Sequence, residues 1–295
     1  MFIVFLNFIL LKIAKEGICK ALAYADDTTL LFSLRPSNIQ ADFEKALTQA
    51  EKVVDIFKSF GLLVNASKTN LVIFRTPQRS ISLEPAFFCG NLCQLSQTTK
   101  CLGLTLHETV RWQAHLSAVA PKCYAISASL RRLRELGVPK EGLLMVYRTL
   151  FLPVLTYAIS IWGGGYDNIS RRAQILQNDA LRAIYARRRR DSVQDIYFAE
   201  NLLLLHRLYK IRVAVLAYKI SKQLVPPEIS FPLTAVVTRS TRRATTFEIP
   251  FVSKEISKHA LAQRLPSIWG SIPREIRSLT SVKIFVREIK KYDQL

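Results

Sequence analysis

The chain has 295 residues, and its 42 Lys and Arg residues against 22 Asp and Glu residues give a formal net charge of +20 at pH 7. Such a charge favours an acidic partner, most commonly a nucleic acid. The hydrophobic content of 49% is ample for the core of one large or two modest domains. The five cysteines are odd in number and scattered, which argues against a disulfide framework and for a reducing intracellular compartment, nucleus or cytoplasm.

The first apolar stretch, residues 1–11, contains only Asn7 as a polar residue. It is shorter than the roughly 20 residues that a membrane span needs. We expect it to form a core helix beneath the following strand, with no membrane partner. A basic protein attached to a membrane by this segment is a weaker alternative.

An adjacent acid pair, Asp26 and Asp27, lies between two apolar runs, 21–24 and 30–32. The pattern predicts two short strands that meet at a tight turn, with the acids at its tip. Carboxylates at such a tip can hold Mg²⁺, which prefers oxygen ligands and is usually bound by one or two carboxylates plus substrate phosphates. For an isolated Asp-Asp pair, the alternative is an ordinary Asx turn.

The clearest helical pattern covers residues 39–57, with Ser37 as a suitable N-cap and Gly61 as a suitable stop. A buried strand is predicted at residues 71–74, and Lys68 lies on the loop before it. The order of strand, acid turn, strand, helix, lysine and strand indicates an α/β layer with polar groups collected at one edge.

Helical periodicity dominates after Trp112. Helices are predicted over residues 112–133, 140–162, 169–186 and 202–223. The run Arg187, Arg188, Arg189 and Arg190 follows the third of them, and a loop-like basic stretch with Arg239, Arg242 and Arg243 precedes short helices near 256–265 and 282–289. Both basic runs are candidate nucleic-acid contacts, with a solvated loop as the alternative.

Cys89, Cys93, Cys101 and His107 could be arranged as a zinc set, but their spacing is not a usual one. The expected arrangement is that of small apolar residues on strands.

Several motifs occur in one order along the chain. They are Tyr24-Ala25-Asp26-Asp27 with Thr28, Gly61-Leu62 with Asn65 and Lys68-Thr69, Leu102-Gly103, Trp112 with His115, Trp162-Gly163, Gln177-Asn178, and Leu265-Pro266 with Trp269. In this combination the sequence resembles the later palm, the thumb and the C-terminal region of a non-long-terminal-repeat (LINE-like) retrotransposon reverse transcriptase. The matches span nearly the whole chain, so the resemblance is specific, whereas the acid turn alone would not be.

The resemblance implies an RNA-directed DNA polymerase that uses Mg²⁺, deoxynucleotides, an RNA template and a DNA primer. Asp26 would be a metal ligand, with Asp27 its weaker neighbour. Tyr24 would pack near the incoming nucleotide or the primer end, and Lys68 would be an acid or a triphosphate contact. Leu102-Gly103 would belong to a hairpin that holds the primer, and the helices that follow would form the thumb.

The sequence also departs from the family pattern. In the family, another metal-binding Asp lies on an earlier palm strand, and a Gly-rich segment lies between that strand and the acid turn. Before Ala21 this chain has one acid, Glu16, and one glycine, Gly17. We therefore expect a catalytically incomplete fragment that does not polymerise DNA alone. The alternative is a non-catalytic basic protein that binds nucleic acid.

Together these patterns predict an α+β fold. A truncated palm, with a small antiparallel sheet and packed helices, is expected over residues 1–110. A helical thumb-like region is expected over 111–225, and a basic tail with short helices over 226–295.

Overall fold

The computed structural model describes residues 2–65, 68–165, 167–226, 233–236, 244–247 and 260–292. The chain divides into two compact units, residues 1–99 and 100–295, and the division falls within a short strand, β5 (Thr98–Cys101). Each unit is described by itself. The predicted boundaries at 110 and 225 stay predictions.

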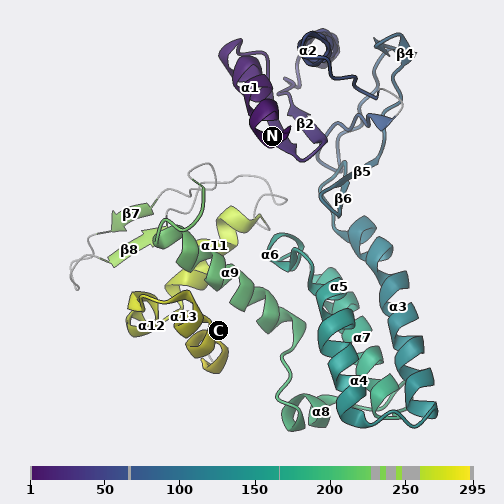
Figure 1. The fold of residues 1–295 in the computed structure, drawn as a ribbon, viewed down its shortest axis with the longest axis vertical. Helices are drawn as coiled ribbons and strands as arrows, with labels where there is room; N and C mark the ends of the chain where they lie inside the picture. The colour runs from purple at the N-terminus through teal and green to yellow at the C-terminus, as the bar shows by residue number, and fades with distance from the viewer. Residues whose placement is uncertain are drawn as a thin grey trace. The chain divides into compact units, whose positions relative to one another are not determined.

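The first unit begins with a helix that covers one face of a hairpin. Helix α1 (Phe2–Lys15) is followed by strands β1 (Lys20–Tyr24) and β2 (Asp27–Leu31), which pair antiparallel, and then by helix α2 (Ile39–Ser59) (Figure 1). The buried residues of α1 pack against those of α2 and against the inner face of the hairpin: Leu6, Ile9, Ile13, Val53, Ile56 and Phe57. The prediction of a core helix beneath the acid-bearing strand is confirmed.

Within the described ranges, no helix is both long enough and apolar enough to cross a bilayer.

Helix α2 ends at a glycine, as the sequence predicts. Gly61 has a left-handed φ of 75°, its N–H donates to the Lys58 carbonyl at 2.8 Å, and the Leu62 N–H donates to the Phe57 carbonyl at 3.0 Å. These bonds satisfy carbonyls that the helix end leaves open. The prediction for the N-terminus is wrong: the cap residue is Asn38, not Ser37, and its side chain makes no capping bond.

The remaining strands of the first unit are short, and the strand predicted at residues 71–74 is absent apart from one bridge. β3 (Phe87–Phe88) pairs antiparallel with β4 (Asn91–Leu92), while the apolar run 71–74 contributes only a single bridge from Leu71 to Leu95. Phe74 at the end of this run is exposed. The prediction of a buried strand here is wrong because an apolar run needs a neighbouring strand to complete its hydrogen bonds, and the described residues place none along it.

The second unit starts with a hairpin and a helical bundle. β5 pairs with β6 (Leu104–His107), and then come α3 (Gln113–Glu135), α4 (Lys140–Val146), a π-helical segment η2 (Tyr147–Phe151), α5 (Leu152–Thr156), α6 (Ile159–Trp162) and α7 (Asp167–Ile184). Helices α3, α4, α5 and α7 lie side by side around a core that includes Tyr147, Phe151 and Trp162 (Figure 1).

One predicted helix, residues 140–162, is broken in the structure. Pro153 has no N–H to donate, and its ring conflicts with the carbonyl four residues earlier, so a wider π-helical turn before it is a common accommodation. The chain then breaks at Tyr157 and Ala158, where Ala158 has a φ of 49°. Pro153 predicts a kink in this helix, and the π-helical segment lies directly before it. The break at Tyr157 and Ala158 is not predicted by the periodicity.

The rest of the second unit packs around α9. Helix α8 (Gln194–Ala199), which the sequence patterns missed, precedes α9 (Leu205–Ser221); α11 (Leu261–Gly270), α12 (Arg274–Ser278) and α13 (Val282–Lys291) gather beside it (Figure 1). The stretch predicted as loop contains two paired antiparallel strands, β7 (Leu233–Val236) and β8 (Ala244–Phe247), so that prediction is wrong at these residues.

The described residues therefore combine helices with small antiparallel sheets, as an α+β fold requires. The strands form four separate pairs, whereas the sequence analysis predicted one small sheet.

Candidate metal and nucleic-acid sites

The acid pair lies at the tip of the first hairpin. Tyr24 and Asp27 are directly opposed at the end of the ladder, and Ala25 and Asp26 form the two-residue turn between them. All four residues are exposed. Because opposed residues on antiparallel strands project to the same face, the structure brings Tyr24 and Asp27 together, with Asp26 beside them on the turn.

The hairpin positions these acids through its two faces. Ala21, Ala23 and Leu30 point inward and pack against the α1 core, while the residues between them point outward. Ala25 has a φ of 52°, a left-handed conformation that costs a residue other than glycine about 1–2 kcal/mol. Strain of this kind is often found where a functional side chain must be held in place.

The donor set at the tip fits a hard cation in part. Asp26 and Asp27 offer only carboxylate oxygens, which suit Mg²⁺ when phosphate oxygens complete its shell. Across the described ranges, no group of three or more His, Cys, Asp or Glu side chains is arranged to hold a metal. The pair alone therefore offers only part of a ligand set for such an ion.

Lys68 lies on an exposed turn before the apolar run. Its N–H donates to the Asn65 carbonyl at 3.2 Å, and the Thr69 hydroxyl donates to the same carbonyl at 3.1 Å. Among the described residues, no ion pair or hydrogen bond joins the Lys68 side chain to Asp26 or Asp27, so the structure does not link this lysine to the acid turn.

Leu102 and Gly103 form the turn between β5 and β6. Their φ values are 46° and 80°, and positive φ at both central residues defines the type I′ turn that suits two-residue hairpins. The predicted hairpin is thus present, and the Leu102 side chain is 48% exposed at its tip.

The arginine run after α7 is exposed at every position. Arg187 pairs with Asp195 at 2.6 Å, and the Arg188 backbone N–H donates to the Asp191 carboxylate at 2.8 Å. The side chains of Arg188, Arg189 and Arg190 form no ion pair among the described residues, so their charges face solvent. Arg239, Arg242 and Arg243 of the second predicted run lie outside the described residues.

Positive charge is divided very unequally between the two units. Residues 1–99 contain ten Lys and Arg against eight Asp and Glu, whereas residues 100–295 contain 32 against 14. The helical unit therefore carries +18 of the net +20. A polyanion would be attracted mainly by that unit.

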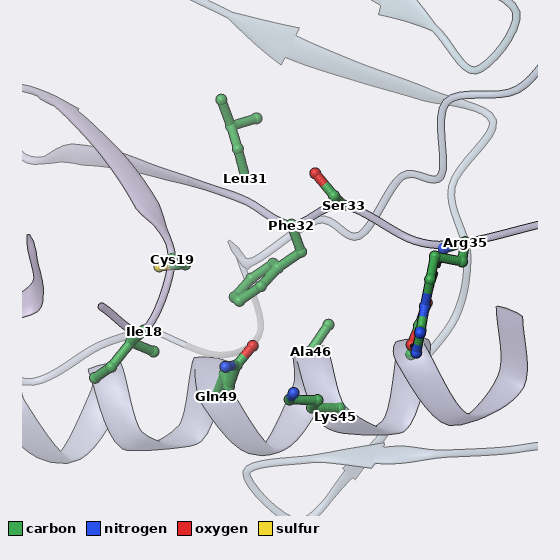
Figure 2. A pocket seen from close by; sticks show the side chains of 10 residues that line it. Ile18, Cys19, Leu31, Phe32, Ser33, Arg35, Lys45, Ala46 and Gln49 are labelled. Carbon is green, nitrogen blue, oxygen red and sulfur yellow. Dashed lines mark hydrogen bonds and ion pairs between the residues drawn. The ribbon is translucent and has the colours of Figure 1, made fainter. Parts of the chain in front are cut away.

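A pocket that the sequence analysis missed lies between the end of β2 and α2. It has a volume of about 500 Å³, and Figure 2 shows Phe32 on one side and Lys45, Ala46 and Gln49 of α2 on the other. At its edge, the Arg35 guanidinium donates to Asp42 at 2.9 and 2.7 Å. These hydrogen bonds lower the pKa of Asp42 to about 2. The only sequence signal was the acid in the first turn of a helix beside a preceding arginine.

A buried polar network also escaped the sequence analysis. Gln177 is fully buried, and its Nε2 donates to the Tyr147 hydroxyl at 2.9 Å and to the Leu203 carbonyl at 3.0 Å, while Gln174 Nε2 donates to Gln177 Oε1 at 3.0 Å. Burial raises the pKa of Tyr147 to about 12. The network joins α7 to η2 and to the segment before α9. Gln177 and Tyr147 are fully buried at its centre, so the role of the network is structural.

Comparison with known proteins gives one informative match. Over 164 residues, 55% of this chain, the sequence is 31% identical to the probable RNA-directed DNA polymerase from transposon BS of Drosophila melanogaster. The chain spans 18% of the length of that protein. No protein-family model matches the chain, and no solved structure gives a significant match. The match confirms the resemblance drawn from the motifs: the chain is similar in sequence to a transposon RNA-directed DNA polymerase.

Proposed function

We propose that this chain supplies the acid turn and the thumb of an RNA-directed DNA polymerase that extends a DNA primer on an RNA template. The observation that carries the proposal is the similarity to a transposon polymerase, in a chain whose Asp-Asp pair lies at the exposed tip of a hairpin. Two carboxylates at such a tip are accessible to a nucleotide, unlike acids on a packed strand.

In this proposal, Asp26 and Asp27 hold Mg²⁺ together with the phosphates of a deoxynucleotide. The bound ion would stabilise negative charge on the reacting oxygens. Tyr24, opposite Asp27, packs beside the incoming nucleotide or the primer end. Lys68 contacts the triphosphate or donates a proton, which requires its loop to approach the tip when substrate binds.

The chain alone is proposed not to polymerise. Metal-assisted phosphoryl transfer uses two cations about 4 Å apart, which clamp the attacking and leaving oxygens. Asp26 lies in the turn and Asp27 is the first residue of β2, so this pair alone does not supply the ligands that two cations need. A further carboxylate has to complete the site, and the described residues bring none to the pair.

Nucleic-acid binding without catalysis is the second candidate function. The charge distribution favours it, because the +18 of residues 100–295 and the unpaired Arg188, Arg189 and Arg190 need no metal to bind phosphates. Both candidates predict binding, and they differ in whether the acid turn contributes.

The test uses the full chain, an RNA template annealed to a labelled DNA primer, and either Mg²⁺ or Mn²⁺. We expect the chain to bind the duplex without extending the primer. We also expect Mn²⁺ to increase its affinity for a deoxynucleoside triphosphate, and Asp26→Ala to abolish that increase. Tightening that is unchanged in Asp26→Ala would favour the non-catalytic candidate. Template-dependent extension that Asp26→Ala abolishes would overturn the proposed inactivity, and absence of binding would overturn both candidates.

A further inference from the structure

Arg277 lies over the ring of a tryptophan that the proposed function leaves unused. Trp269 on α11 contacts the rings of Phe247 and Phe285 and is only 4% exposed. The guanidinium carbon of Arg277, on α12, lies 5.7 Å from the centre of this ring. The negative face of an aromatic ring attracts a cation in this position. Trp269 therefore holds the Arg277 guanidinium against the core of the second unit.

The Arg277 guanidinium has no acceptor within the described part of the chain. Its Nε atom is buried and makes no hydrogen bond, whereas the two terminal nitrogens, which make none either, stay open to solvent. Burial lowers the pKa of Arg277, the charge of Arg274 lowers it further, and the charge of Glu275 raises it. No ion pair joins Glu275 to the guanidinium among the described residues. An acceptor that carries negative charge would therefore offset both the burial and the repulsion.

A second arginine extends the positive charge of α12. Arg274 is exposed and lies three residues before Arg277, a spacing that puts two side chains on one face of a helix. Its side chain forms no ion pair among the described residues, and like charges at this spacing destabilise a helix. Helix α13, which packs on α12 (Figure 1), shows the opposite arrangement: the Arg287 Nε donates to Glu288 at 2.9 Å. Helix α12 therefore presents two arginines with which no described acid pairs.

We propose that Arg277 and Arg274 bind a phosphodiester group of a nucleic acid. The terminal nitrogens of a guanidinium form a planar fork that matches two phosphate oxygens, and Trp269 fixes the plane of that fork in Arg277. A nucleic acid is favoured over an acidic peptide because the +18 of residues 100–295 attracts the denser polyanion. The inference rests on the proposed function, since it adds a phosphate contact on α12 to the arginine run after α7.

Two substitutions separate the charge of Arg277 from its shape. Arg277→Gln removes both the charge and the fork, whereas Arg277→Lys keeps a cation over Trp269 and removes only the fork. Arg287→Gln is the matched control, because it makes the same change on the adjacent helix at an arginine that Glu288 already neutralises.

The first measurement is the affinity of each full-length variant for a random-sequence RNA–DNA duplex over a range of salt concentrations. We expect Arg277→Gln to bind about 10-fold more weakly at physiological salt, and its slope of log affinity against log salt to fall by about 1. Arg277→Lys should keep the slope and lose about threefold in affinity. Arg287→Gln should match the unmodified chain in both quantities. A purely structural arginine would change the melting temperature but leave the slope unchanged.

The second measurement locates the contact in the unmodified chain. Fluorotryptophan labels the three tryptophans, Trp112, Trp162 and Trp269, and Trp269→Phe identifies the Trp269 signal in the fluorine NMR spectrum. We expect the duplex to shift that signal and to leave the other two in place, because Trp269 lies under the bound guanidinium. Polyglutamate of equal total charge should shift the Trp269 signal far less.

Three outcomes would overturn the inference. If the duplex binds the unmodified chain, but the slope of Arg277→Gln is unchanged or the Trp269 signal does not shift, Arg277 only covers the tryptophan and the proposed function stands. A shift by polyglutamate as large as that by the duplex would assign the site to acidic peptides. If the unmodified chain does not bind the duplex at all, the proposed function fails, and the inference fails with it.

Discussion

The two units of this chain differ in both charge and burial. Residues 1–99 are nearly neutral and bury a small core between α1, α2 and the first hairpin. Residues 100–295 carry almost all of the positive charge and enclose a continuous core that runs from β6 to α13. The acid pair belongs to the first unit and the unpaired arginines to the second.

This difference suggests a division of roles. Long-range attraction of a polyanion depends on net charge, whereas metal binding depends on a few placed oxygens. A nearly neutral unit can present carboxylates to a nucleotide without placing them among many competing cations. In the proposed function, the basic unit is the part that holds the duplex.

The largest expected effect is on the core of the second unit. Gln177→Leu removes the partner shown for the Tyr147 hydroxyl and for the Leu203 carbonyl, while the Gln174 amide keeps Asn178 and Tyr197 as acceptors. A buried polar group left unpaired costs about 1–3 kcal/mol. We therefore expect the free energy of unfolding of the helical unit to fall by about 3 kcal/mol, as measured by urea denaturation.

The control for this change is Gln113→Leu. The buried Oε1 of Gln113 has no hydrogen-bond partner in the described part of the chain. Its replacement should be neutral or stabilising. An equal decrease in the free energy of unfolding in Gln177→Leu and Gln113→Leu would show that the polar network does not stabilise the second unit.

A smaller effect is expected at the border between the units. Gly103→Ala adds a Cβ within 3.2 Å of Tyr157 at a φ of 80°, whereas Gly137 has a φ of 81° and nothing within 4 Å. Both alanines carry the left-handed penalty of about 1–2 kcal/mol. Calorimetry should therefore show Gly103→Ala as the more destabilised variant. Identical melting shifts would mean that Tyr157 does not pack on the turn.

The smallest effect is a pH dependence confined to the first unit. Hydrogen bonds from Arg35 lower the pKa of Asp42 from its ordinary 3.8 to about 2. A lowered carboxyl pKa stabilises the fold above pH 4, and this contribution disappears as the pH falls from about 4 to 2. At neutral pH, Asp42→Asn should have a lower melting temperature than the unmodified chain. Near pH 2 the two melting temperatures, measured by circular dichroism, should be equal. A difference that persists at pH 2 would point to lost packing instead.

Much of the fold could be predicted from local patterns. The alternation around Asp26-Asp27 gave the hairpin, and Gly61 gave the end of α2, because both depend on neighbouring residues alone. The strand at residues 71–74 failed because strand formation needs a partner elsewhere in the chain. The break at Tyr157 could not be predicted from local patterns either. It depends on Pro153 together with the contacts that Tyr157 makes with Trp162 and Leu102.

The candidate sites, like the fold, could be predicted only where their residues are close together in sequence. The acids, the Leu102-Gly103 turn and the arginine run are contiguous in sequence and were found there. The pocket beside Arg35 and Asp42, and the network around Gln177, join residues from separate elements and were not. Tyr147 and Trp162 are buried, whereas Tyr157, on the same stretch of helical periodicity, is half-exposed.

The most direct test of the division of roles compares two charge-matched triple variants. One replaces Arg188, Arg189 and Arg190 with Ala, and the other replaces Lys45, Lys52 and Lys58, which are exposed on α2 of the first unit. Each phosphate contact contributes about 0.9 to the slope of log affinity against log salt. The measurement is the affinity of each full-length variant for a random-sequence RNA–DNA duplex from 50 to 300 mM salt.

The arginine variant should lose about 100-fold in affinity near physiological salt, for every duplex sequence alike, and its slope should fall by about 2 to 3. The lysine variant should stay within about threefold of the unmodified chain, because those charges belong to the nearly neutral unit. Equal losses in the two variants, or binding that does not depend on salt, would contradict the account.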